Sequence, residues 1–321
     1  ADTPSEVFVL TGDGELQEGQ FWESLPGAVN HSMHEINIII DHNKLQSDTF
    51  VREVSDLGDL EAKIRAFGFY VERCDGNDVA AVSATLGRMR AQRGRPSCLI
   101  ADTIKGKGVS FMEHTALDSD VELYKFHSGA PGSEAYRDAV EELIRNANAL
   151  MRDLGQDDLR FDQHDVPITP AAEVTDHLIP TYSKALVDQA KTNSNLVALD
   201  ADLILDTGLI PFKENYAERF IECGIAEQDM VSIAGGMALK GSLPVVHSFG
   251  CFLAQRPVEQ IYNNATEQTR IIYVASLSGV IPAGPGHSHQ SVRDISTISS
   301  IPGMTVVEPA NSKELVRLLD W

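Results

Sequence analysis

The sequence predicts an α/β fold with two domains, each a mostly parallel sheet covered by helices. Strand-like apolar runs alternate with helix-like runs along most of the 321 residues, a pattern typical of a parallel sheet with helices on both faces. A polar, acidic stretch ending near residue 165 interrupts the alternation, which then resumes. The chain is long enough for two domains that each bury a core. We therefore expect a first domain at residues 1–165 and a second at residues 166–321.

The first half of the chain opens with an apolar run at residues 6–10, which we predict to be a strand. Helix-like and strand-like runs then alternate up to residue 103, and one more helix lies in the polar stretch. In order, the expected elements are a helix at 20–31, a strand at 35–40, a helix at 57–68, a strand at 70–74, a helix at 79–92, a strand at 97–103 and a helix at 134–150.

The second half repeats this pattern and stops inside a helix-like run at residues 312–321. Its expected elements are a helix at 174–191, a strand at 196–200, a helix at 227–240, a strand at 244–249, a helix at 258–266 and a strand at 270–275. A parallel layer normally continues on both sides of such elements. We therefore interpret the chain as a fragment, or as a chain whose remaining pieces lie elsewhere.

Composition excludes several classes of partner. A formal net charge of −21 argues against nucleic acid or an anionic membrane as a partner, so an anionic cofactor would need a metal, helix ends or a few lysines. Cys74, Cys98, Cys223 and Cys251 are scattered without C-x-x-C spacing, which favours reduced thiols inside the cell. No apolar run is long enough to span a bilayer, and Ala1 does not open a signal peptide. We expect a cytoplasmic protein.

The ends of the first two predicted strands carry a pair of oxygen ligands. Asp13 follows the first apolar run, and Asn43 follows the second run thirty positions later. Neighbouring parallel strands would bring both side chains to one hard cation, such as Mg²⁺, which usually shares its ligands with phosphates. Gly12 and Gly14 would let the backbone approach an anion at the start of the next helix. Gly-Asp-Gly alone is an ordinary turn, but with Asn43 it predicts a metal–diphosphate site.

These residues resemble a known signature. Gly-Asp-Gly followed about thirty residues later by Asn resembles the thiamine diphosphate signature, and the flanking Glu18-Gly19 and Lys44-Leu45 resemble transketolases. The resemblance covers nearly the whole chain. It implies a diphosphate-binding first domain that lacks its start, an aminopyrimidine-binding second domain, and no third domain.

The resemblance also implies the ligands of the metal. The side chains of Asp13 and Asn43 and the backbone carbonyl of Leu45 would hold Mg²⁺ (or Ca²⁺) on the diphosphate of the cofactor. Glu18 matches a glutamate that the family uses near its dimer interface, where it could couple two active centres. A surface carboxylate is the alternative interpretation of Glu18.

Glu227 precedes an apolar, glycine-bearing helix. A carboxylate at this position can simply be an acid favoured by the helix dipole. The run from Gly224 to Gln228, however, resembles the family's cofactor-activating motif. That resemblance implies a hydrogen bond from Glu227 to the aminopyrimidine ring nitrogen, which favours the imino tautomer that removes the thiazolium C2 proton.

Two aromatic residues follow the strand predicted at 244–249. Phe249 and Phe252 could be ordinary core residues, but the family places a Phe-x-x-Phe pair against the pyrimidine ring. His289 ends a run that resembles the family's Gly-x-Thr/Ser-His-Gln, which makes it a candidate to exchange a proton with the substrate hydroxyl. His287 is a nearby rival.

A lysine-glycine loop precedes one further histidine. Lys105 and Lys107 resemble the family's Lys-Gly-Lys-Gly loop and could pair with the diphosphate. His127 resembles the family's loop histidine, which reaches the diphosphate and the reacting carbonyl. Ser128 separates His127 from Gly129, so the register is open by one residue, and a solvated loop histidine is the alternative.

The second domain departs from pentose-phosphate transketolases at the sugar-binding positions. Counting back from His289, Leu277 occupies the position of the family's substrate-binding histidine. The position of the sugar-reading aspartate falls near Pro285, and that of the phosphate-binding serine falls near Asp206. Residues 178–186 contain no arginine. A carboxylate repels a phosphate dianion, and without arginine the site lacks the strong bidentate hydrogen bonds that a guanidinium makes to phosphate. We therefore expect a non-standard sugar substrate.

The resemblance implies an enzyme that moves a two-carbon ketol unit from a ketose to an aldehyde through a thiamine diphosphate carbanion. Its expected partners are small-molecule sugars and a second copy of the chain, in a homodimer with the active site at the interface. One alternative is a deoxyxylulose-phosphate-synthase-like enzyme that decarboxylates pyruvate. Another is a catalytically silent subunit or scaffold of a thiamine diphosphate enzyme.

Overall fold

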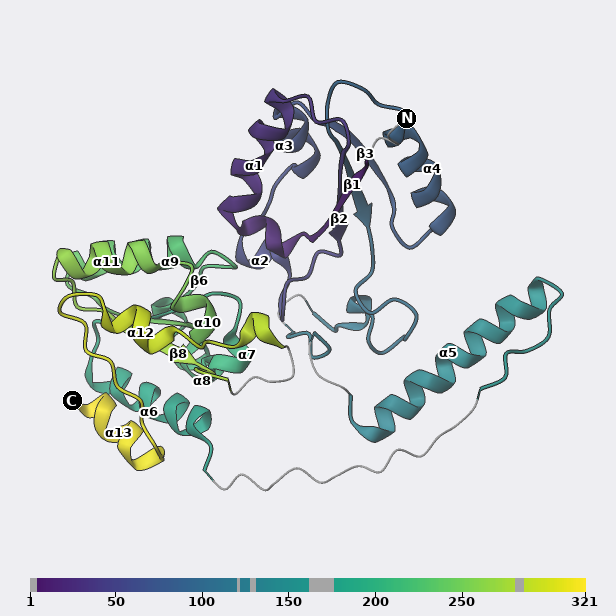
Figure 1. The fold of residues 1–321 in the computed structure, drawn as a ribbon. Coiled ribbons are helices and arrows are strands. Elements are labelled where there is room, and N and C mark those ends of the chain that lie inside the picture. Colours follow the sequence, from purple (N-terminus) through teal and green to yellow (C-terminus); the bar gives the residue numbers. More distant parts are fainter. Residues whose placement is uncertain (1–4, 120–121, 128–130, 162–175, 281–285) are drawn as a thin grey trace. The chain divides into compact units, whose positions relative to one another are not determined.

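The chain forms two α/β units, each built on a sheet of parallel strands, which Figure 1 shows as ribbons. The computed structural model describes residues 5–119, 122–127, 131–161, 176–280 and 286–321. The two compact units are Ala1–Ala172 and Glu173–Trp321. The predicted fold class is therefore confirmed. The predicted boundary at residue 165 falls outside the described residues.

The first unit contains a four-stranded parallel sheet in the order β1-β2-β4-β3. Its strands are β1 (Val7–Gly12), β2 (Ile36–His42), β3 (Tyr70–Asp75) and β4 (Ser97–Asp102). Its α-helices are α1 (Gly19–Asn30), α2 (Val51–Val54), α3 (Leu60–Ala66), α4 (Val79–Arg90) and α5 (Ser133–Asp153). Short 3-10 helices lie at Gly14–Gln17 and His114–Ala116.

Helices cover both faces of this sheet because successive strand residues point to opposite sides. Ile38 and Ile40 of β2 belong to a core with residues of α1 and α3, whereas Ile39 packs in the cluster that contains Met89 of α4. Figure 1 shows α1 and α3 on one side of the sheet and α4 on the other. The helix starts are set locally: the carboxylate of Asp78, for example, accepts from two backbone N–H groups of α4.

The second unit contains another four-stranded parallel sheet, in the order β6-β5-β7-β8. Its strands are β5 (Leu196–Asp200), β6 (Phe220–Glu222), β7 (Leu243–Phe249) and β8 (Ile272–Ser276). Its α-helices are α6 (Leu178–Thr192), α7 (Ile204–Thr207), α8 (Ile210–Asn215), α9 (Glu227–Leu239), α10 (Gly250–Leu253), α11 (Val258–Thr266), α12 (Asp294–Ser299) and α13 (Ser312–Asp320). Two 3-10 helices lie at Ala217–Arg219 and His287–His289.

The core of the second unit joins β5 and β7 to α9 and α11. Met230 and Val231 of α9 are fully buried against Leu199 and Val246. Helix α6 packs against α13 and reaches the sheet through Tyr182, whose hydroxyl lies 2.5 Å from Nε2 of the buried His247 on β7.

The predicted elements recur within a few residues at each end. The strand at 196–200 and the helix at 258–266 have the predicted bounds, while the helix predicted at 57–68 is shorter, Leu60–Ala66. Residues 174–175 of the helix predicted at 174–191 lie outside the described residues. No helix in the described ranges is long and apolar enough to cross a membrane, and all four cysteines are free.

Candidate active site

The first cluster of predicted residues lies at the carboxyl ends of β1 and β2. These strands pair in parallel with Gly12 opposite Asp41, so Asp13 and Asn43 follow neighbouring strand ends. Asp13 is 1% exposed, and its carboxylate accepts from the N–H of Gly14 at 2.9 Å and from the N–H of Lys44 at 2.5 Å. Burial raises the pKa of Asp13, and these two hydrogen bonds oppose the rise. A cation beside the carboxylate would offset the remaining cost of burying its negative charge.

The loop after β2 is shaped around this carboxylate. Lys44 has φ +71°, in the left-handed region that costs a residue with a side chain about 1–3 kcal/mol. This turn brings the N–H of Lys44 to Asp13 and lets the Asn43 side chain accept from the N–H of Leu45 at 3.0 Å. The three predicted metal ligands therefore belong to one hydrogen-bonded loop pair.

The two glycines of the motif differ in their surroundings. A Cβ on Gly14 would lie 3.2 Å from Cβ of Gln46, a tight contact that would require the loop of Gln46 to shift slightly. A Cβ on Gly12 would meet no atom of the described residues within 4 Å, so packing among these residues does not require a glycine there. The space beside Gly12 is what a closely approaching ligand would use.

The motif is not followed directly by the start of a long helix. The element that directly follows Asp13 is the short 3-10 helix Gly14–Gln17, for which Asp13 is the N-cap, and α1 begins only at Gly19. Glu18 is half-buried at the junction of the two helices, with its backbone N–H bonded to the carbonyl of Glu15 at 3.1 Å. The structure thus places Glu18 one helical turn beyond the predicted metal ligands.

Lys105 and His127 come together beside the same loop. The ammonium of Lys105 donates to the backbone carbonyl of Gln46 and lies 3.1 Å from Nδ1 of His127. Burial first, and Lys105 second, lower the pKa of His127. Because an ammonium only donates, Nδ1 of the neutral imidazole must accept, and its proton then resides on Nε2.

Lys107 takes a different partner from Lys105. Its ammonium pairs with the carboxylate of Glu113 at 3.3 Å. Ser128 and Gly129 lie outside the described residues, so the register at His127 stays open by one residue.

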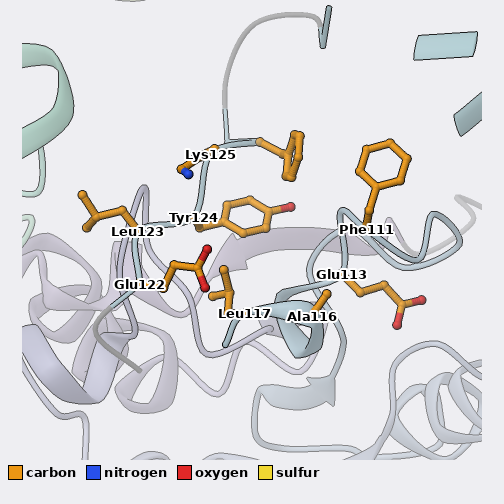
Figure 2. A pocket seen from close by; sticks show the side chains of 9 residues that line it. Phe111, Glu113, Ala116, Leu117, Glu122, Leu123, Tyr124 and Lys125 are labelled. Carbon is orange, nitrogen blue, oxygen red and sulfur yellow. The ribbon is translucent and has the colours of Figure 1, made fainter. Parts of the chain in front are cut away.

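A small cavity is lined by residues between Phe111 and Phe126 (Figure 2). Its volume is about 80 Å³, and its lining includes Tyr124, Glu122 and Lys125. Ligand pockets usually measure about 300–1,000 Å³, so this cavity is too small for a cofactor. The cavity therefore does not serve as the diphosphate site.

The second cluster lies at the carboxyl edge of the other sheet. Glu227 is the first residue of α9 and is 2% exposed. Nη1 of Arg256 donates to both of its carboxylate oxygens, at 2.7 and 2.9 Å. An ion pair with hydrogen bonds to both oxygens compensates much of the cost of burying this carboxylate. Sequence reasoning missed Arg256, although an arginine shortly after a predicted aromatic pair was the available signal.

The predicted aromatic residues and His289 form a group of rings that contacts this ion pair through Phe252. The rings of Phe249 and Phe252 lie 5.8 Å apart, and the His289 ring lies 6.1 Å from the first and 5.3 Å from the second. The guanidinium of Arg256 stacks over Phe252 at 4.2 Å. His287 begins the same 3-10 helix as His289.

The positions that depart from pentose-phosphate transketolases can be placed in part. Leu277, with φ +51°, packs against the cluster of Leu203, Phe249 and Cys251. Asp206 lies in α7, and burial raises its pKa. Pro285 is outside the described residues.

Two acids at this sheet edge were also missed. Asp200 and Glu222 end the paired strands β5 and β6 in register. Burial raises the pKa of Asp200 well above its usual range, with a second contribution from Glu222. Burial likewise raises the pKa of Glu222 to about 7.

Comparison with known families agrees with this division. Residues 3–122 match the family model described as transketolase, thiamine diphosphate binding domain, and residues 179–321 match the model described as transketolase, pyrimidine binding domain. The chain belongs to the transketolase family. The two matched regions thus fall in separate units, one match in each.

Relatives in the family are similar over nearly the whole chain. Transketolase-like protein 2 of Mus musculus is 33% identical over 317 residues, which cover 95% of this chain and 49% of the relative. Transketolase of Homo sapiens is 28% identical over 320 residues, covering 95% and 48%. The chain spans about half the length of the curated relatives it matches. A crystal structure of transketolase from Campylobacter jejuni is 20% identical, with a TM-score of 0.43, and covers 98% of this chain and 54% of that one.

Proposed function

We propose that this chain carries the cofactor-binding halves of a thiamine diphosphate-dependent transferase of the transketolase kind. The reaction is the transfer of a two-carbon ketol unit from a ketose to an aldehyde. The observation that carries the proposal is the gathering of the predicted residues at the carboxyl edge of each sheet. Asp13 and Asn43 follow paired strands in one unit, and Glu227 adjoins the aromatic pair through Arg256 in the other.

The residues present fit the cofactor and its metal. Asp13 supplies a buried carboxylate, and Asn43 and Leu45 supply amide and carbonyl oxygens, which are the ligands that Mg²⁺ or Ca²⁺ prefers. The open space at Gly12 gives a diphosphate room to approach. Lys105 adds a positive charge nearby. When bound, thiamine diphosphate supplies the nucleophilic carbon that breaks and re-forms the carbon–carbon bond.

Each remaining residue has a role that follows from its surroundings. Glu227 offers a fixed carboxylate to the pyrimidine ring, and Phe249 and Phe252 offer apolar surface to the same ring. His127 is neutral and donates from Nε2 to the oxygen of the reacting carbonyl. His289 exchanges a proton with the substrate hydroxyl.

We infer that the substrate is a non-standard sugar. Leu277 presents an apolar side chain at the sheet edge that carries Phe249, and Asp206 is a carboxylate where the family binds phosphate. Neither side chain favours a sugar phosphate. The homodimer and the cytoplasmic location rest on the family resemblance and on composition.

Calorimetric titration with thiamine diphosphate tests the cofactor site directly. We expect binding that requires Mg²⁺ in the parent chain and is at least about tenfold weaker in Asp13→Ala, since one metal ligand is lost. Asp138→Ala, which removes an exposed carboxylate from α5, serves as the matched control. Equal affinity in all three proteins would exclude Asp13 as a metal ligand, and absence of binding by the parent would contradict the proposed function.

A rate assay then tests the substrate class. Xylulose 5-phosphate with ribose 5-phosphate is compared with an unphosphorylated ketose and aldehyde. We expect the unphosphorylated pair to react faster. The reverse order would contradict the inference drawn from Leu277 and Asp206.

A further inference from the structure

We propose that Arg256 is a positioning residue that keeps Glu227 ionised, so that a ring nitrogen in contact with Glu227 must carry the proton itself. This inference rests on the proposed function, in which Glu227 contacts the pyrimidine ring of the cofactor. It assigns to Arg256 the choice of where that proton resides.

The geometry fixes Arg256 from two sides. Its backbone carbonyl accepts from the side-chain amide of Gln228 at 3.1 Å, which ties the turn before α11 to the residue after Glu227. Its guanidinium rests on the ring of Phe252 at 4.2 Å. Between these two attachments, Nη1 meets both oxygens of Glu227 at 2.7 and 2.9 Å. The arginine therefore sets the direction of the carboxylate as well as its charge.

Charge and burial make this pairing decisive for protonation. A guanidinium stays charged at every pH at which the protein is folded. Glu227 is 2% exposed, and a buried carboxylate without a partner takes up a proton rather than remain charged. With Arg256 present, Glu227 accepts a hydrogen bond. Without Arg256, Glu227 becomes the donor.

Other titratable groups lie near the pair in the described part of the unit. Asp229 lies in the first turn of α9. Cys251 lies on α10; burial first raises the pKa of its thiol, and Arg256 and Glu227 shift that pKa in opposite directions. His289 contacts the ring of Phe252, on which Arg256 also stacks. Arg256 is the cation that contacts the Glu227 carboxylate within the described part of the unit.

The proton balance of cofactor binding follows from this arrangement. In the parent chain the ring nitrogen binds as N–H⁺ against the carboxylate, so a proton is taken from solvent where the free cofactor is unprotonated. In Arg256→Gln the proton is already on Glu227 and forms the hydrogen bond to the neutral nitrogen. No proton then comes from solvent.

Calorimetry in buffers of different ionisation enthalpy measures this proton uptake near pH 7.5. We expect about one proton per bound thiamine diphosphate in the parent chain and close to none in Arg256→Gln, since the buried carboxyl is then protonated beforehand. Arg256→Lys keeps the charge and should restore the uptake. Arg293→Gln is the matched control, because Arg293 donates to Gln255 at 3.1 Å, next to Arg256 in the chain. Equal uptake by the parent and Arg256→Gln would overturn the proposal.

A second measurement keeps the inference testable without the cofactor. If the parent chain binds no thiamine diphosphate, the proposed function fails, and a double-mutant cycle still tests the pair. Melting temperatures of Arg256→Gln, Glu227→Gln and the double variant are compared with the parent. Strongly non-additive shifts support the pairing, and additive shifts overturn it. The same cycle decides the matter if Arg256→Gln is too unstable for titration.

Discussion

At the scale of single residues, Gly12 separates what the fold needs from what a ligand needs. A side chain on Gly14 would press on Gln46, but a side chain on Gly12 meets open space within the described structure. The signature therefore contains one glycine with a packing role and one without. A glycine that belongs to the signature but is not required for packing indicates close contact with a ligand.

Gly12→Ala should lower cofactor affinity and leave stability almost unchanged. The added methyl group enters the space beside Asp13 where the diphosphate would approach, while the folded chain has room for it. We expect a loss of about tenfold or more in thiamine diphosphate affinity and a change of less than about 0.5 kcal/mol in unfolding free energy. Titration and chemical denaturation measure the two effects. Gly19→Ala, which also meets nothing within 4 Å, is the control, and equal affinity in Gly12→Ala would argue against a ligand there.

At the scale of elements, the long strands and helices could be predicted because each carries its signal locally. The aliphatic run of β2 and the 9-residue pattern of α11 are examples. Short elements could not be predicted: β6 has only 3 residues, too few for any periodicity. For Arg256 the sequence offered only its place shortly after the aromatic pair, and its contact with Glu227 could not be predicted, because that contact depends on how the turn before α11 approaches the start of α9. The pairing of Asp200 with Glu222 depends likewise on strand register.

Strand β1 is the element whose surroundings agree least with its composition. A continuous apolar run is typical of a strand buried on both faces, yet β1 ends the sheet order and Val7, Phe8, Val9 and Leu10 are 43–73% exposed. An apolar edge strand is a site for association with another chain.

Leu10→Lys should therefore reduce self-association of this chain. Leu10 is 73% exposed, so a lysine there costs little folding free energy and places a charge on the open edge. Sedimentation velocity over a range of concentrations measures the effect. Leu154→Lys replaces a leucine that is 72% exposed at the end of α5. If both substitutions reduce association equally, added charge and not the β1 edge is responsible.

At the scale of the whole molecule, the two sheets share one arrangement: parallel strands whose carboxyl ends carry the polar residues. This is the edge at which open α/β sheets bind ligands. A net charge of −21 makes local compensation necessary at both edges. Backbone N–H groups meet Asp13 in one unit, and Arg256 meets Glu227 in the other. In the described part of the chain, Asp200 and Glu222 instead accept from backbone N–H groups and from the hydroxyl of Thr207, and they hold protons more readily than exposed carboxyls do.

That difference predicts how stability depends on pH. Glu222 accepts from the N–H groups of Asp202 at 2.8 Å and Gly224 at 3.0 Å, and burial raises its pKa from 4.5 to about 7. The folded state thus binds this proton more tightly than the unfolded state. The stabilisation that comes from this proton is fully present below about pH 4.5 and is lost as the pH rises through about 7. Because part of the side chain remains exposed, we expect a loss on the order of 2 kcal/mol.

Glu222→Gln should weaken this pH dependence, because the amide cannot ionise and still accepts both hydrogen bonds, while the raised pKa of Asp200 contributes a loss of the same sign in both proteins. Calorimetric unfolding of the second unit from pH 4.5 to 8 measures the effect. The parent should lose stability across that range, while the variant should change less. Glu218→Gln replaces a side chain that is 75% exposed just before β6 and should behave like the parent. A parent chain whose second unit gains stability between pH 5 and 7 would show that Glu222 does not hold a proton in the folded state.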